Sequence, residues 1–365
     1  MASNPIRVGV LTGGGDCPGL NAVIRAVVRT SIGCYGWEIF GISDGFEGLL
    51  HDSAVRPLGD NEHGLLVRGG TILGTTNRGN PFEYMEEVDG ALVERDYSDT
   101  VVERYHKLGF NALIVIGGDG SLKIADRFWH EKGLNVVGIP KTIDNDLKAT
   151  DMTFGYQTAI VTATDAIDKL KTTAESHHRV MVLETMGRYV GWIALESGIG
   201  GGAHAILIPE IPYDIEVVAR HITERSDSGR HFSIVVVSEG AYPAGGEPIH
   251  LAAQKLEKGA PRLGGIGDQV AHALGDLTGF ETRCMVLGHL QRGGIPCAFD
   301  RVLSTRFGVA AVELVAAEQW GRMVCLRGES IESRPIIEAV SEFKAVEPDS
   351  QIVRTAERLG VSLGR

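Results

Sequence analysis

The sequence predicts an α/β protein built from parallel sheets that helices cover. Three observations support this class. Strand-like and helix-like patterns alternate along the whole chain, which is typical of parallel sheets. Glycine-rich turns follow several apolar strand segments, as they do where a strand leads into a helix. The 365 residues, 43% of them hydrophobic, can bury a large core and are enough for two domains.

The chain begins with a unit in which a glycine-rich turn joins a strand to a helix, and a second such unit follows. The first has a strand near residues 7–11, the turn Gly13-Gly14-Gly15 and a helix near 20–31. The second has the strand 112–116, then the turn Gly117-Gly118-Asp119-Gly120-Ser121 and a helix directly after it.

A third strand, at residues 135–139, leads into the loop that holds Asp144. In open parallel sheets, ligands bind just beyond the carboxyl ends of the strands. The loops that follow these three strands can therefore converge on one crevice.

The second half of the chain continues the alternation. The expected elements are a helix at 156–171, a strand at 180–184, a helix at 191–197, and strands at 205–208 and 233–237. Two of these strands end just before Met186 and Glu239, so candidate site residues again follow strand ends. The glycine-dense stretch 198–202 predicts a turn.

The turn at residues 117–121 has the features of a phosphate cradle. Glycines without Cβ atoms let a ligand approach the backbone, and the N–H groups at the start of the next helix face an anion. Asp119 would repel a bare phosphate, so its presence indicates Mg²⁺ between the two. Such a turn alone is a weak signal.

Asp144 and Asp146 are two positions apart, so on an extended segment both carboxylates point to one side and Asn145 to the other. One can accept a proton from a substrate hydroxyl while the other positions substrate or metal, which is the division that phosphoryl transfer requires. For the triplet alone, the alternative is an Asx-rich surface turn.

Composition limits the possible partners and surroundings. The net charge of −12 argues against a broad surface for nucleic acid or for an anionic membrane. The five cysteines are odd in number and lack paired metal-type spacing, which favours a reduced, cytoplasmic protein. The first residues lack a basic region before an apolar core, and no stretch approaches the roughly eighteen apolar residues of a membrane helix.

Blocks along nearly the whole chain resemble the phosphofructokinase family. They are residues 8–16, 18–21, 69–74, 117–121, 140–146, 186–188, 238–240 and 287–294. The resemblance implies two doubly wound domains with mainly parallel sheets and the active site in the cleft between them. It places the phosphoryl-donor domain at 1–155 plus 291–341, and the fructose 6-phosphate domain at 156–290 plus 342–365.

The reaction that the resemblance implies is phosphoryl transfer from MgATP to the 1-hydroxyl of fructose 6-phosphate. The products are fructose 1,6-bisphosphate and ADP, and the reaction belongs to glycolysis. Asp144 matches the general base of the family. Thr142 matches a residue that holds the transferring phosphoryl group, and Arg188 matches one that stabilises its charge.

The resemblance also implies the binding residues. The sugar contacts are Asp146, Met186, Gly187 and Glu239, and the 6-phosphate ligands are His289 and Arg292. The donor contacts are Gly15, Arg78, Gly118, Asp119, Gly120 and Ser121, with Asp119 reaching Mg²⁺. Phe46 stands where the family often has an aromatic residue near the nucleotide, although it fits the core equally well.

Arg179 and Arg283 match phosphate-binding arginines that the family supplies from a neighbouring subunit. The expected assembly is therefore a homo-oligomer, usually a tetramer in this family and sometimes a dimer. From the residues alone, each arginine could equally be a solvated surface charge.

Two positions bear on the donor. ATP users of the family have glycine at position 120, as here, whereas the aspartate of pyrophosphate users obstructs the α-phosphate site. Lys141 instead matches pyrophosphate users. We expect ATP because steric exclusion is decisive, while a lysine can coexist with the phosphates of a nucleotide. A second departure is Asn77, where bacterial ATP users have an arginine that Arg78 could replace after a local shift.

Other classes fit less well. NAD kinases and lipid kinases share the Gly-Gly-Asp-Gly turn but lack the blocks at 142–146 and 287–289, and a nicotinamide dehydrogenase would need a Gly-x-Gly-x-x-Gly helix start. Pyrophosphate-dependent fructose 6-phosphate 1-phosphotransferase remains the alternative enzyme. The alternative outside catalysis is a sugar-phosphate-sensing paralogue, although such proteins typically lose the base or the arginine.

Arg25, Arg29 and Lys171 are basic at positions that match the allosteric effector site of the family, which lies between subunits. His204 stands where a metal-binding glutamate is often found. The family's usual control by ADP or phosphoenolpyruvate is therefore expected to be altered or absent.

Overall fold

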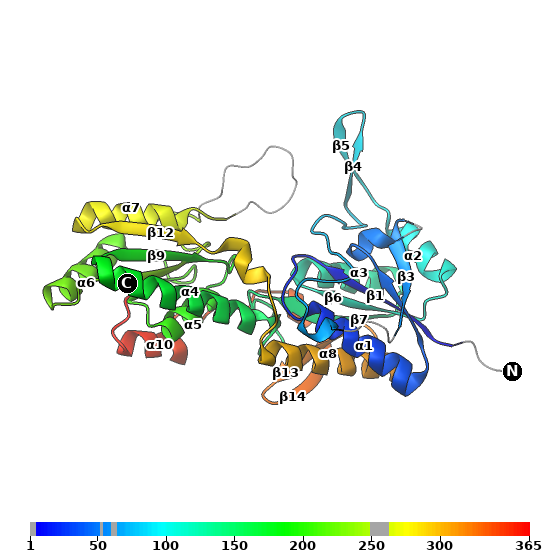
Figure 1. The fold of residues 1–365 in the computed structure, drawn as a ribbon. Helices are drawn as coiled ribbons and strands as arrows, with labels where there is room; N and C mark the ends of the chain where they lie inside the picture. The colour runs from blue at the N-terminus through cyan, green and yellow to red at the C-terminus, as the bar shows by residue number, and fades with distance from the viewer. Residues whose placement is uncertain (1–4, 52–53, 60–63, 249–262) are drawn as a thin grey trace. The chain divides into compact units, whose positions relative to one another are not determined.

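The computed structural model describes residues 5–51, 54–59, 64–248 and 263–365. The chain divides into two compact units. The first comprises Met1–Gln157 and Arg292–Phe343, and the second comprises Thr158–Gln291 and Lys344–Arg365. Each unit contains a mainly parallel sheet with helices packed on it, which confirms the predicted α/β class (Figure 1). That the first unit binds the phosphoryl donor and the second binds fructose 6-phosphate stays a prediction.

Among the described residues, the first unit is built on an eight-stranded sheet. Its strands lie in the order β14, β13, β7, β6, β1, β2, β3, and the short β8 pairs with β7. The five middle strands are parallel, and antiparallel pairing joins β14 and β3 at the two edges. The bounds are β1 (Arg7–Gly13), β2 (Glu38–Ile42), β3 (Val55–Leu58), β6 (Ala112–Gly117), β7 (Val136–Thr142), β8 (Phe154–Gly155), β13 (Arg322–Arg327) and β14 (Ser330–Pro335).

Helices pack on this sheet, with α1 along α8 and α3 against β6, β7 and α9. A separate antiparallel hairpin, β4 (Tyr84–Val88) and β5 (Ala91–Arg95), projects from the first unit (Figure 1). The helical bounds are α1 (Leu20–Tyr35), η1 (Gly45–Leu49), η3 (Leu65–Val67), α2 (Ser98–Lys107), α3 (Asp119–Lys132), α8 (Ala298–Ala316) and α9 (Ile336–Val340).

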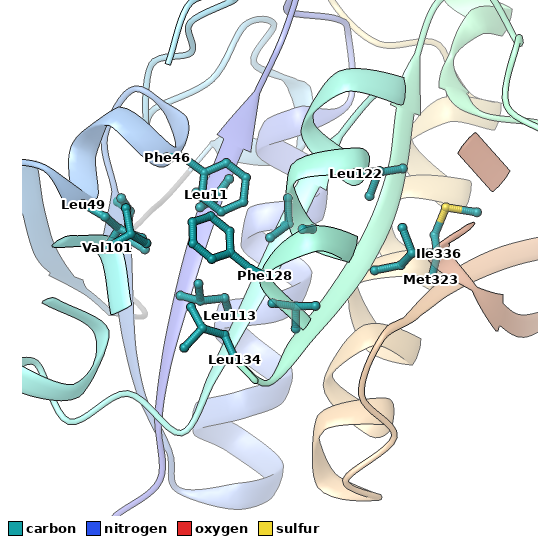
Figure 2. Packing of buried hydrophobic residues seen from close by; sticks show 14 of the residues in the cluster. Leu11, Phe46, Leu49, Val101, Leu113, Leu122, Phe128, Leu134, Met323 and Ile336 are labelled. Atoms are coloured by element: carbon teal, nitrogen blue, oxygen red, sulfur yellow. The ribbon is translucent and has the colours of Figure 1, made fainter. Parts of the chain in front are cut away.

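Phe46 belongs to the hydrophobic core of the first unit. Its side chain is 3% exposed, and its ring lies 5.3 Å from that of Phe128, centroid to centroid. Figure 2 shows the two rings together among Leu11, Leu113 and other aliphatic side chains. Of the two predictions made for Phe46, the structure therefore supports the core residue.

The second unit has a four-stranded parallel sheet in the order β10, β11, β9, β12. Its strands are β9 (Val180–Thr185), β10 (Ala205–Leu207), β11 (Ser233–Ser238) and β12 (Thr282–Val286). Its helices are α4 (Tyr156–His177), which begins at the end of the first unit, α5 (Trp192–Gly201), α6 (Ile215–Asp227), α7 (Ile266–Thr278), η4 (Gly288–Arg292) and α10 (Gln351–Arg358).

The predicted turn at 198–202 is wrong for most of its length. Helix α5 continues to Gly201, and Gly202 ends it in the left-handed conformation, with φ of 66°. A Cβ atom on Gly198 would lie 2.6 Å from Ile206, and one on Gly201 would lie 2.6 Å from Ile167. The glycines therefore allow the helix to pack closely against its neighbours.

The last residues complete the second unit. The indole nitrogen of Trp192 donates to the carbonyl oxygen of Lys344 at 2.7 Å, and the amide of Val346 donates to Glu210 at 2.8 Å. Ser362 pairs with Ala205 in a parallel bridge at the edge of the sheet. None of the helices in the described ranges is long and apolar enough to span a bilayer.

Candidate active site

Three loops meet at one edge of the sheet in the first unit. Strands β1, β6 and β7 are neighbours, and their register pairs Gly13 with Gly117 and Gly117 with Pro140. The carboxyl ends of the three strands are therefore level. The sequence predicted this convergence, and strand register accounts for it.

The glycines in these loops make room for protein side chains as well as for a ligand. A Cβ atom on Gly13 or on Gly117 would lie 2.4 Å from an atom of the Ser121 side chain, and one on Gly15 would lie 2.6 Å from the Arg292 guanidinium. Gly120 differs, because no atom lies within 4 Å of its Cβ position. Of these glycines, Gly120 is therefore the one that borders open space.

The turn at 117–121 is the start of helix α3. Gly118 is its N-cap and Asp119 is its first residue. The Asp119 carboxylate accepts a hydrogen bond from Lys123 one turn later, at 3.0 Å. This places a carboxylate and the unpaired amides of a helix start side by side, which suits a phosphate carrying a divalent cation.

The loop after β7 buries both predicted acids. Asp144 is 7% exposed and Asp146 is 9% exposed. The amide of Asp144 donates to the hydroxyl oxygen of Thr142 at 3.0 Å, which holds the hydroxyl beside the carboxylate. The structure thus brings the predicted base together with the predicted phosphoryl-binding residue.

The prediction of an extended segment between the two acids is wrong. Asn145 has φ of 54°, in the left-handed region, and the chain bends there. Its side-chain oxygen accepts a hydrogen bond from the amide of Thr153 at 3.2 Å. The side-chain amide of Asn145 therefore stabilises the bend between the two carboxylates.

Burial, together with the nearby Asp144 carboxylate, raises the pKa of Asp146 to about 7. No described residue donates a hydrogen bond to Asp146 Oδ1, although this oxygen is buried. Asp146 Oδ1 can therefore bind a cation or accept a hydrogen bond from a hydroxyl group.

The described residues hold no cluster of three or more side chains that could coordinate a metal on their own. Mg²⁺ usually binds through one or two carboxylates together with phosphate oxygens and water, so a complete protein cage is not needed. Asp119 at the helix start, with the buried oxygen of Asp146 in the next loop, fits that mode.

Lys141 lies inside the first unit rather than on its surface. Its side chain is 3% exposed, and its ammonium donates a hydrogen bond to the carbonyl oxygen of Gly15. Burial lowers the pKa of Lys141. The lysine thus joins the end of β7 to the loop after β1.

Arg292 also contacts the first glycine turn, since its guanidinium donates to the carbonyl oxygen of Asp16 at 3.2 Å. Its predicted role as a 6-phosphate ligand stays a prediction. Arg78 is exposed and lies just after Thr76, whose hydroxyl accepts a hydrogen bond from the Arg78 amide at 3.0 Å. Its contact with the donor stays a prediction too.

In the second unit, two loops at neighbouring strand ends bring Arg188 and Glu239 together. The register pairs Thr185 with Ser238, the last residues of β9 and β11. The amide of Arg188 donates to the Glu239 carboxylate at 3.1 Å. Met186 and Gly187 lie in the same loop, with Gly187 at φ of 147° and Arg188 at φ of 54°.

Of the remaining predicted ligands of the second unit, Arg179 directly precedes β9, and Arg283 and His289 lie in and after β12. Arg179 and Arg283 both pair with the Glu281 carboxylate, Arg179 at 2.8 Å. His289 is exposed in η4. Strand β12 is at the edge of its sheet, so Arg283 is accessible to another molecule. Supply of either arginine across an interface stays a prediction.

Thr75 also contributes to the site, which the sequence did not reveal. Its hydroxyl donates to the carbonyl oxygen of Gly14, and the amide of Gly14 donates to the carbonyl oxygen of Thr76 at 3.0 Å. The segment after residues 69–74 is therefore part of the first glycine turn. In the sequence, the position of Thr75 directly after the glycine block at 69–74 was the available signal. A hydroxyl in such a loop has many possible partners, so this signal did not identify its contact.

The fold and these loops define a protein that binds phosphorylated ligands at strand ends of parallel sheets. A family model described as Phosphofructokinase matches residues 7–315, so the chain belongs to the phosphofructokinase family.

Curated relatives cover almost the whole chain. An ATP-dependent 6-phosphofructokinase of Chloroflexus aurantiacus is 52% identical over 100% of this chain and 99% of its own length. ATP-dependent 6-phosphofructokinase 2 of Clostridium perfringens is 50% identical over 98% of each chain. A pyrophosphate–fructose 6-phosphate 1-phosphotransferase of Amycolatopsis methanolica is 49% identical over 94% of this chain and 97% of its own.

Solved structures agree on the fold. Phosphofructokinase from Saccharomyces cerevisiae matches with a TM-score of 0.79 and 33% identity over 92% of this chain. The match covers 45% of the yeast chain, so this chain spans less than half of that protein.

Proposed function

We propose that this protein is an ATP-dependent 6-phosphofructokinase, which phosphorylates the 1-hydroxyl of fructose 6-phosphate in glycolysis. The observation that carries the proposal is the buried pair Thr142 and Asp144, level with two glycine turns at the edge of one sheet. The names of the relatives at 50% and 52% identity support both the acceptor and the donor.

In this proposal Asp144 accepts the proton of the sugar 1-hydroxyl as that oxygen attacks the terminal phosphorus. Burial excludes water from the carboxylate and so keeps the proton transfer local. Thr142, fixed against the Asp144 amide, is in reach of the same phosphoryl group. Arg188 stabilises the negative charge that the phosphoryl group spreads over its oxygens in the transition state.

Mg²⁺ would be held by Asp119, with Asp146 in support, and would neutralise charge on the donor phosphates. The helix start at Gly118 to Ser121 offers backbone N–H groups to the same phosphates. These residues bind and orient the donor.

ATP is the donor that the two glycine turns favour. The open space at Gly120 leaves room for a nucleotide's α-phosphate, and the Lys141 ammonium is already engaged by the carbonyl oxygen of Gly15. Pyrophosphate is the second candidate, since Lys141 is present and pyrophosphate-using relatives of Amycolatopsis are 49% and 50% identical.

On the sugar side, Met186, Gly187 and Glu239 contact the sugar, while Arg179, Arg283, His289 and Arg292 bind its 6-phosphate. We infer a cytoplasmic homo-oligomer, usually a tetramer in this family, in which a neighbouring subunit provides Arg179 and Arg283. Strand β12 at a sheet edge, with Met285 and Val286 about half exposed, supports an interface there. Arg25, Arg29 and Lys171 match the family's effector site, but His204 replaces its metal-binding glutamate, so we infer that control by ADP or phosphoenolpyruvate is altered or absent.

The test measures fructose 1,6-bisphosphate made from fructose 6-phosphate and Mg²⁺, with ATP or pyrophosphate as sole donor. Product with ATP alone is expected. Product with pyrophosphate alone would establish the second candidate. No product with either donor would leave a sugar-phosphate-sensing protein, which binding of fructose 6-phosphate by calorimetry would then detect.

A further inference from the structure

The first glycine turn is anchored through three consecutive carbonyl oxygens. Thr75 donates to Gly14 O, Lys141 to Gly15 O, and Arg292 to Asp16 O. The three donors come from three different segments of the first unit. Side chains from distant segments therefore hold one short stretch of backbone in place.

The anchors determine where the amides of the turn point. In a trans peptide the C=O and the next N–H point in opposite directions. Thr75, by binding Gly14 O, therefore directs the Gly15 N–H away from itself, and Lys141 does the same for the Asp16 N–H. Among the described residues, no backbone carbonyl oxygen accepts a hydrogen bond from either amide. Both amides are thus available to an anion.

Lys141 is suited to this role by its burial. Lys141 is 3% exposed, so its ammonium must find an acceptor within the protein, and in the described part of the chain it donates to the Gly15 carbonyl oxygen. A hydrogen bond with a charged donor is stronger than a neutral one, so Lys141 holds the Gly15 carbonyl more firmly than Thr75 holds the preceding one.

We propose that Lys141 is a positioning residue, whose ammonium fixes the Gly15 carbonyl and so aims the Asp16 amide at the phosphates of the donor. This deepens the proposed function, on which it rests. Lys141 then supports donor binding through the backbone of the glycine turn, without touching the donor. Lys141 contributes equally to the binding of any donor whose phosphates reach the first glycine turn.

The first arm of the test needs no ligand. Hydrogen exchange is measured on a peptide spanning residues 11–20 in the wild type and in Lys141→Met, which keeps the length of the side chain and removes the ammonium. Exchange in this peptide should become about tenfold faster, because one charged hydrogen bond no longer restrains the turn. Lys148→Met is the matched control, since Lys148 pairs with Glu342 on the surface of the same unit.

The second arm measures binding of the non-hydrolysable ATP analogue AMP-PNP, and separately of pyrophosphate, each with Mg²⁺. Lys141→Met should weaken the binding of whichever probes the wild type binds by about tenfold, and leave the KM for fructose 6-phosphate within about twofold. Lys141→Arg should restore most of the affinity, since a guanidinium can also donate to the carbonyl.

Faster exchange with weaker donor binding supports the proposal. Weaker donor binding with unchanged exchange would overturn it in favour of direct contact between the lysine and the phosphates. Unchanged donor binding would overturn it whatever the exchange shows. If Lys141→Met does not fold, Lys141→Leu, which also lacks a hydrogen-bond donor, replaces it, with the same expected results. A wild type that binds AMP-PNP without phosphorylating fructose 6-phosphate would refute the proposed function and leave this inference standing.

Discussion

The amide of Asp144 donates a hydrogen bond of 3.0 Å to the hydroxyl oxygen of Thr142, two residues earlier. The bond closes a small turn in which the predicted base and the predicted phosphoryl-binding hydroxyl are neighbours. Both side chains are buried, at 7% and 8% exposure. A substrate hydroxyl brought to one of them is therefore within reach of the other.

Replacing Asp144 with Ser should reduce kcat by about 10²–10⁴, because the sugar hydroxyl then loses its proton acceptor. The KM for fructose 6-phosphate should change by less than about threefold, since ground-state binding depends little on this proton transfer. Steady-state kinetics with ATP measure both. Asp165→Asn, at an exposed ion pair on α4, is the control and should behave as the wild type. Near-normal kcat in the Asp144 variant would refute the assignment of the base.

Gly120→Asp should raise the KM for ATP by at least about tenfold, because the new carboxylate enters the open space at this position and repels the donor phosphates. Gly120→Ala is the matched control. Its single methyl group meets no atom within 4 Å, so the KM should stay within about threefold. If the two variants bind ATP equally well, the donor does not pass this position.

Gly240→Ala tests the loop that carries Arg188. The new Cβ atom would lie 2.0 Å from the carbonyl oxygen of Arg188, so the backbone must move. We expect a loss of about 1–3 kcal/mol in the free energy of unfolding, and a lower kcat because Arg188 is displaced. Denaturant unfolding and kinetics measure the two effects.

Gly33→Ala provides the contrast. Gly33 lies within α1, and no atom is within 4 Å of its Cβ position. Alanine there should stabilise the protein by about 0.5–1 kcal/mol, since it is the better helix former, and leave the kinetics unchanged. Equal stability of the two glycine variants would mean that the Arg188 loop adjusts without strain.

The main strands and loops could be predicted from the sequence because their signals are local. Residues 112–116 form an apolar, branched run that ends in glycines, and the structure has β6 there, followed by α3. Asp144 could be placed near a ligand because it follows a strand of the same kind. Such inferences need only hydrophobic pattern and turn chemistry.

Other features depend on contacts between distant segments. The continuation of α5 to Gly201 depends on Ile167 and Ile206, which the local glycine pattern does not reveal. The hydrogen bond of Lys141 to Gly15 joins residues 126 positions apart. From the sequence, a lysine before Thr142 indicates only a positive charge near the donor. Its hydrogen bond to the backbone can be seen only in the tertiary structure.

The last prediction concerns Asp146, whose pKa is raised to about 7 mainly by burial. The folded state then binds a proton that the unfolded state has already released between about pH 4 and pH 7. The free energy of unfolding therefore falls as pH rises through this window, and the full penalty is present above pH 7.

Asp146→Asn removes the charge and the penalty with it. The variant should unfold at a higher temperature than the wild type at pH 8, and the difference should shrink towards pH 4. Thermal unfolding of both proteins without Mg²⁺ or substrate, followed by circular dichroism from pH 4 to pH 8, measures this. A variant that is less stable than the wild type at pH 8 would show that the ionised carboxylate is stabilised by the fold, and a difference independent of pH would show that Asp146 does not titrate in this range.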